Sequence, residues 1–248
     1  TMTFFARDYT ASSVEGGLRI GFNIWCLALI ALSVYTLFSV FQSETKKAKV
    51  VSGVATIALW ALAAVLYFRM PGTVNIQPSD FQQFNPFYVV ALTPVSLAIF
   101  GALAKKGKEP SAPRKIGLGM LVAAAGFLIL TLASFGLQSP KALGGTVSPD
   151  LVSPTWLIST YLVLTFAELL LSPMGISFVS KVAPPKYKGM MMGGWFAATA
   201  IGNYLVSIPG LLWMRVPLWT VWVVLIVICV IAGVFMFANM KRIESATE

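Results

Sequence analysis

One acidic residue lies inside a long apolar stretch of this 248-residue chain, and it is the residue best placed to do chemistry. Glu168 stands in the segment YLVLTFAELLLSP, whereas the other eight of the nine aspartates and glutamates lie in polar segments. If the stretch crosses a membrane with Trp156 at its edge, about 12 residues at ~1.5 Å each place Glu168 roughly 18 Å deep. A charge at that depth costs about 2.5–3.5 kcal/mol on insertion scales. Two interpretations follow: a protonated acid bonded to a neighbouring helix, or a carboxylate that meets a cationic substrate group or exchanges a proton.

Two residues close to Glu168 add to this candidate site. Ser172 follows four positions later and therefore shares a helix face with it. Pro173 removes a backbone donor, which predicts a kink or a freed carbonyl at that level. A Ser-Pro pair alone is typical of a packing kink; beside the one acid in an apolar stretch it indicates a site.

An asparagine stands near the start of another apolar stretch, in FQQFNPF. Asn85 precedes Pro86, and this order has two interpretations. Asparagine and proline are both favoured at helix N-termini, so Asn85 could be a cap. Alternatively, its amide needs a partner within the membrane and could contact a substrate.

The segment KGMMMGGWFAATAIGNYL is rich in small residues at four-residue spacing, which lets helix backbones approach closely. Trp195 lies within this segment. The usual interpretation of such a tryptophan is a residue of the aromatic belt at the inner membrane interface. Thr199 is one turn further along the same face, and Asn203 a turn beyond it. This polar stripe predicts that one side of the helix faces a cavity.

Several classes of chemistry are excluded. The chain has no histidine, so imidazole catalysis and histidine metal sites are impossible. Cys26 and Cys229 each lie in an apolar run and are expected to be small buried side chains. No nucleophile elbow, zinc-protease motif or phosphate loop occurs. We therefore expect no enzyme, no metal site and no organic cofactor.

The composition requires a membrane as the environment of these residues. Hydrophobic residues make up 57% and charged residues 11% of the chain, and the mean hydropathy is +0.81. Soluble domains carry about 25% charged residues. Apolar runs long enough to cross a bilayer as helices occur at about 20–41, 50–68, 85–104, 116–137, 155–180, 190–214 and 218–240. The predicted fold class is an all-α integral membrane protein with about seven transmembrane helices.

The basic residues predict the orientation. They concentrate in the segments after the first, third, fifth and seventh spans: Lys46, Lys47, Lys49, Lys105, Lys106, Lys108, Arg114, Lys115, Lys181, Lys186, Lys188, Lys241 and Arg242. The positive-inside rule places these segments and the C-terminus in the cytoplasm. Four tryptophans near the opposite ends, Trp156, Trp213, Trp219 and Trp222, are expected to form an aromatic belt. The net charge of +9 therefore implies no nucleic-acid partner, and at most contact with anionic lipid heads.

Three segments together resemble consecutive signatures of the proton-coupled oligopeptide transporter (POT) family of the major facilitator superfamily. They are FQQFNPF, AELLLSPMGISFVSKVAP and KGMMMGGWFAATAIGNYL, in the family's order, on family helices eight, ten and eleven. The opening TMTFFARDYT is similar to the end of family helix seven. The resemblance covers about residues 1–12 and 76–242 and implies that the chain is the C-terminal part of a longer transporter.

The resemblance implies roles for the candidate residues. Glu168 corresponds to the acid that receives the positively charged amino terminus of a di- or tripeptide. Asn85 corresponds to an amide that hydrogen-bonds the peptide. Ser172, Trp195 and Thr199 correspond to residues on the same cavity face.

The resemblance also implies a division of the chain and a function. Residues 1–15 would be the end of helix seven and an outer loop, 16–72 an inserted transmembrane helix pair in an atypical place, and 73–248 helices eight to twelve. The expected function is proton-coupled peptide symport across the bacterial inner membrane by alternating access, with the proton as coupling ion. The bilayer and the N-terminal half of the transporter would be partners. The alternatives are transport of another small solute on the same fold, or a non-transporting membrane subunit or scaffold.

Overall fold

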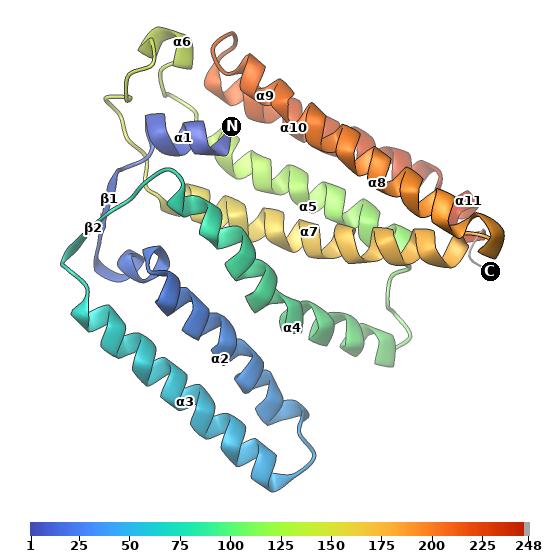
Figure 1. Cartoon of the computed structure of the whole chain (residues 1–248). Coiled ribbons are helices and arrows are strands. Elements are labelled where there is room, and N and C mark those ends of the chain that lie inside the picture. The colour runs from blue at the N-terminus through green and yellow to red at the C-terminus, as the bar shows by residue number, and fades with distance from the viewer. Residues whose placement is uncertain (246–248) are drawn as a thin grey trace.

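A computed structural model describes residues 1–245 as a bundle of antiparallel helices (Figure 1). Seven helical segments within these residues are long and apolar enough to cross a membrane, which confirms the predicted fold class. The long helices are α2 (Ile24–Gln42), α3 (Lys46–Arg69), α4 (Phe84–Lys105), α5 (Ala112–Ala133), α7 (Thr155–Val182), α8 (Lys188–Leu205) and α10 (Leu218–Ala238). Shorter helices are α1 (Met2–Tyr9), α6 (Pro140–Leu143), α9 (Ser207–Leu212) and α11 (Met240–Ser245).

The fourth span begins and ends about four residues earlier than its hydropathy predicts. Its start is set by Ser111, whose hydroxyl accepts a hydrogen bond from the Arg114 backbone, and by Pro113 in the first turn. Gly136, with a φ of +83°, lies in the turn beyond its end. Lys115, expected in a loop, therefore lies inside α5 and is buried, so its assignment to the loop was wrong.

The central layer is formed by α5 between α7 and α10, with glycines at the closest approaches (Figure 1). A Cβ atom added to Gly119 would lie 3.0 Å from the Ala167 carbonyl oxygen. One added to Gly126 would lie 2.8 Å from a methyl carbon of Leu164. These two glycines allow α5 to pack directly on the helix that carries Glu168.

The outer ends of the helices, where the charge pattern places the outer face, meet in an aromatic cluster. Phe5 and Tyr9 of α1 pack against Trp213 and Trp222, with neighbouring ring centroids about 6 Å apart. The Trp222 indole also donates a hydrogen bond to Ser134 Oγ at 2.9 Å. Trp213 and Trp222 are buried, so the prediction that they belong to a lipid-facing belt was wrong.

The pair α2 and α3 forms a hairpin held by side-chain hydrogen bonds between its two helices. Thr36 bonds Thr56 at 2.8 Å, and Ser39 bonds Ser52 at 2.9 Å. One turn further, the Trp60 indole donates to a serine hydroxyl of α2 at 2.9 Å. Such bonds contribute on average about 0.6 kcal/mol each in membranes. The ladder therefore makes the hairpin a unit with its own internal stabilisation.

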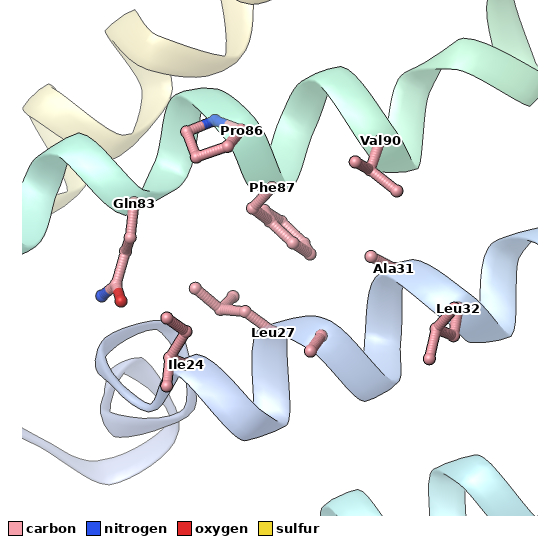
Figure 2. Close-up of a pocket in the computed structure, with 9 residues that line it drawn as sticks. Ile24, Leu27, Ala31, Leu32, Gln83, Pro86, Phe87 and Val90 are labelled. Atoms are coloured by element: carbon pink, nitrogen blue, oxygen red, sulfur yellow. The ribbon is translucent and has the colours of Figure 1, made fainter.

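An apolar groove separates this hairpin from the rest of the bundle. It lies between α2 and α4, has a volume of about 380 Å³, and is lined by Leu27, Ala31, Phe87 and Val90 among others (Figure 2). At one end, the Gln83 amide bridges the two parts by donating to the Gly21 carbonyl at 3.1 Å. The hairpin thus contacts the bundle through α2 and stands to one side of it (Figure 1).

The two ends of the hairpin segment meet in a short antiparallel ribbon. Strand β1 (Ser13–Glu15) pairs with β2 (Thr73–Asn75), and Glu15 lies opposite Thr73. The Ile76 amide extends the ladder by donating to the Ser12 carbonyl at 2.7 Å. The chain therefore enters and leaves this segment at one point.

Removing the α2–α3 hairpin is expected to leave the remaining bundle folded. A deletion of residues 17–71 joins Gly16 directly to Gly72, and a two-residue Gly-Gly turn is suited to closing an antiparallel pair. Gly16 already has a φ of +61°. In the full-length protein that contains this sequence, we expect a yield of folded protein within about twofold of the parent, measured by size-exclusion chromatography. The control deletion of residues 14–74 also removes the ribbon and should abolish expression of folded protein. Loss of folding in both deletions would contradict an independent hairpin.

Candidate substrate-binding face

Glu168 lies on the exposed surface of α7 and is hydrogen-bonded across to α4. The Asn85 amide donates to its Oε2 at 2.9 Å, and the same amide lies 3.5 Å from the hydroxyl of the fully buried Thr165. Within residues 1–245, Glu168 Oε1 has no hydrogen-bond partner. The carboxyl group is therefore oriented by one neighbour and has an oxygen free to accept a further donor.

The structure decides between the two interpretations of Asn85. The N-cap of α4 is Gln83, and Asn85 is already inside the helix, so the capping interpretation was wrong. The preceding turn, Asp80–Gln83, is fixed by the Asp80 carboxylate, which accepts a hydrogen bond from the Gln77 backbone N–H at 2.9 Å. This turn sets the start of α4 so that the Asn85 side chain meets Glu168 on the neighbouring helix.

Ser172 and Gly175 continue the Glu168 face of α7 towards the C-terminal end of the helix. The helix runs unbroken through Pro173, which leaves the Leu169 carbonyl without its usual intrahelical donor. Ser172 is exposed one turn from Glu168. A hydroxyl and a carboxyl group thus follow one another along a single face.

Trp195 of α8 packs directly on this face. A Cβ atom at Gly175 would lie only 2.2 Å from the far edge of the indole ring, so the ring occupies the space that the missing side chain leaves. The half-buried ring therefore lies against α7. Gly175 lies about 10 Å along the helix from Glu168, at ~1.5 Å per residue.

Thr199 lies one turn from Trp195 on α8 and is exposed. Its hydroxyl donates to the Trp195 carbonyl at 2.9 Å. Because α8 runs antiparallel to α7, Thr199 is displaced from Trp195 towards the level of Glu168 (Figure 1). Its hydroxyl is engaged within its own helix and does not bond Glu168.

The structure therefore joins Asn85 and Glu168 directly and places the other candidates along the same region of α7 and α8. One member of the cluster, Thr165, was missed by the sequence reasoning, although its position three residues before Glu168 on the same helix face could have indicated it. Within the described part of the chain, no group of three or more cysteine or acidic side chains is arranged to hold a metal ion.

Within the described residues, seven helices long and apolar enough to cross a bilayer, with an oriented acid on one of them, define the class of multi-pass membrane proteins with a candidate functional site. Residues 53–212 match the sequence model of the POT family. The chain belongs to the POT family, a family of transporters and not of enzymes.

Curated relatives of this chain are peptide permeases. It is 31% identical over 205 residues to dipeptide and tripeptide permease B of Salmonella typhimurium, covering 73% of this chain and 40% of that protein. It is 37% identical over 142 residues to the peptide transporter YePEPT of Yersinia enterocolitica, covering 57% of this chain and 26% of that protein. The chain thus spans less than half the length of these relatives.

Solved structures agree on the fold. A crystal structure of a POT peptide transporter in complex with sulfate aligns with a TM-score of 0.54 and 25% identity, covering 89% of this chain and 40% of that one. The crystal structure of a mutant POT peptide transporter aligns with a TM-score of 0.57 and 21% identity. The alignment covers 100% of this chain and 44% of that one. The fold is that of part of a POT transporter.

Replacing Asn85 with alanine is expected to weaken solute binding by about tenfold. The substitution removes the bond that orients the Glu168 carboxyl group, and bonds to charged groups contribute about 1.5–3 kcal/mol. The apparent affinity for a dipeptide, measured in proteoliposomes, checks this. Thr165→Val removes only the 3.5 Å contact and should change the affinity less. If Asn85→Ala and Glu168→Gln reduce affinity additively, Asn85 does not act through Glu168.

Proposed function

We propose that this chain forms the C-terminal part of a proton-coupled symporter of di- and tripeptides. The proposal is supported by membership of the POT family and by about 30% identity to dipeptide and tripeptide permeases. Residues 1–15 would end helix seven, residues 16–72 would be an insertion, and residues 73–248 would provide helices eight to twelve.

In this proposal Glu168 receives the ammonium group of the peptide. Asn85 holds the carboxylate in place by the 2.9 Å bond, and this oriented, exposed carboxyl group is the observation that carries the proposal. Ser172, Trp195 and Thr199 line the same cavity. The N-terminal half of the transporter supplies the opposite wall and the groups that bind the peptide carboxylate.

Transport then requires that peptide and proton bind the inward-open and outward-open states with different affinity. Pairing of the Glu168 carboxylate with the peptide ammonium group supplies part of that difference, because this ion pair forms only in the state that brings the two groups together. The two halves rock about this midplane site. The protein lies in the bacterial inner membrane with the basic loops and the C-terminus in the cytoplasm.

Uptake into proteoliposomes tests the proposal. The full-length protein that contains these residues should accumulate a labelled dipeptide when an inward proton gradient is imposed, and accumulation should collapse with a protonophore. Unlabelled di- and tripeptides should compete, whereas single amino acids and nitrate should not. Competition by these small solutes alone would favour transport of another substrate, and no uptake of any solute would favour a non-transporting subunit.

A further inference from the structure

A second, partly polar cavity lies between α4, α5 and α7, nearer the cytoplasmic ends than Glu168. Its volume is about 420 Å³. Its α4 residues belong to the C-terminal half of that helix, which diverges from α5 and α7 (Figure 1). The walls are mostly apolar, with two hydroxyl groups on α4; they include Leu97, Phe100, Leu170, Met174, Thr93 and Ser96.

The charged residues inside this cavity neutralise each other. Lys115 is 5% exposed, forms an ion pair with Glu109, and its Nζ lies 4.3 Å from the centre of the Phe100 ring. A buried charge in a membrane protein needs such partners. Lys115 is therefore committed to holding α5 against α4, and the interior of the cavity carries no net charge.

The segment that leads from Gly101, in the α4 wall of this cavity, to Glu109, which also lines it, is strongly basic. Lys105, Lys106 and Lys108 are exposed at the end of α4, directly before Glu109. The turn that carries them is ordered: the Lys108 amide donates to the Leu103 carbonyl at 2.9 Å, and Gly107 has a φ of +63°. No carboxylate within residues 1–245 pairs with these three lysines.

The next basic residue along the loop, Arg114, already has a carboxylate partner. Arg114 pairs with Glu244 at 2.9 Å, and the Ser111 hydroxyl donates to the same carboxylate at 2.6 Å. First the Ser111 bond and then Arg114 hold the pKa of the Glu244 carboxyl below its usual range. The unneutralised charge of this loop therefore resides on the three lysines between Gly101 and Glu109.

We propose that this cavity binds an anionic phospholipid of the cytoplasmic leaflet, with an acyl chain between α4 and α7 and its phosphate at Lys105, Lys106 and Lys108. Basic pockets between transmembrane helices on the cytoplasmic side recognise such headgroups. The apolar walls of the cavity suit an acyl chain, and the three lysines suit the negative charge of the phosphate. The lysines follow the end of α4, where the headgroup region of the leaflet is expected. The inference is independent of which solute is transported.

Lipid binding to the full-length protein in detergent tests this directly. Native mass spectrometry should show more retained phosphatidylglycerol than phosphatidylcholine with the same acyl chains. Replacing Lys105, Lys106 and Lys108 with glutamine should reduce that preference at least threefold. The matched control replaces Lys46, Lys47 and Lys49, three exposed lysines in the first turn of α3, and should leave the preference unchanged.

A second variant tests binding of the lipid acyl chain separately from binding of the headgroup. Gly101 lines the cavity, and an added Cβ would contact no atom within 4 Å, so Gly101→Leu fills the space without a backbone clash. It should reduce retention of both lipids several-fold. Equal retention of the two lipids by the parent, equal effects of the two lysine triples, or unchanged retention in Gly101→Leu would each overturn the proposal.

Discussion

Replacing Glu168 with glutamine is expected to reduce uptake of peptides with a free amino terminus by more than about tenfold. Glutamine keeps the shape and can still accept the Asn85 bond, but it cannot pair with an ammonium group or carry a proton. An interaction with a charged partner is worth about 1.5–3 kcal/mol, and about 1.4 kcal/mol corresponds to a factor of ten. Proton-driven uptake of a labelled dipeptide by the full-length protein is the measurement.

Two controls make this result specific. Glu44→Gln alters an exposed acid in the turn between α2 and α3 and should leave uptake unchanged. Binding of an N-acetylated dipeptide, which lacks the ammonium group, should be equally weak in the parent and in Glu168→Gln. If free-amino peptides bind and enter the variant as they do the parent, Glu168 is not the group that receives them.

Gly175→Ala is expected to lower both thermal stability and uptake. The new methyl group would lie 2.2 Å from the edge of the Trp195 ring, so the ring or α8 must move. Overpacking of this kind typically costs about 1–3 kcal/mol. Because Trp195 is a proposed pocket residue, its displacement should also raise the KM for a dipeptide several-fold. Scanning calorimetry or thermal-shift measurement of the purified protein, together with uptake kinetics, checks both effects.

A compensating substitution tests the cause. Trp195→Phe removes the far ring atoms that an alanine at position 175 would strike, so the double variant should regain stability relative to Gly175→Ala alone. Gly53→Ala, in the middle of α3, is the matched control because its Cβ would meet only an ordinary contact at 4.0 Å. Equal destabilisation by Gly53→Ala would show that the effect comes from the helix backbone and not from the ring.

The number, type and approximate bounds of the spans were predictable because crossing a bilayer requires length and apolar composition, which any sequence displays directly. Side-chain partners were less predictable, since hydropathy records transfer into an apolar medium and not the neighbours found there. Trp213 and Trp222 show the difference: their positions at helix ends suit a lipid-facing belt, but aromatic residues of α1 cover them.

The candidate site shows the same limit. Asn85 is suited both to capping a helix and to bonding across helices, and only the distance to Glu168 separates the two. Lys115 was counted with the loop charges because basic residues cluster around it; its burial depends on Glu109 and Phe100 being within reach. Pairings between segments far apart in the chain require the packed structure.

The ribbon at residues 13–15 and 73–75 makes this transporter open to engineering at a defined position. Its strand ends are held together whatever they enclose, and closing a longer loop adds only about 0.6 kcal/mol for each doubling of its length. A fluorescent protein, an affinity tag or a rigid fiducial for electron microscopy could replace the natural hairpin there. Such a chimera would report on the molecule from the end of the bundle where the ribbon lies, while every helix that carries the candidate site keeps its own neighbours.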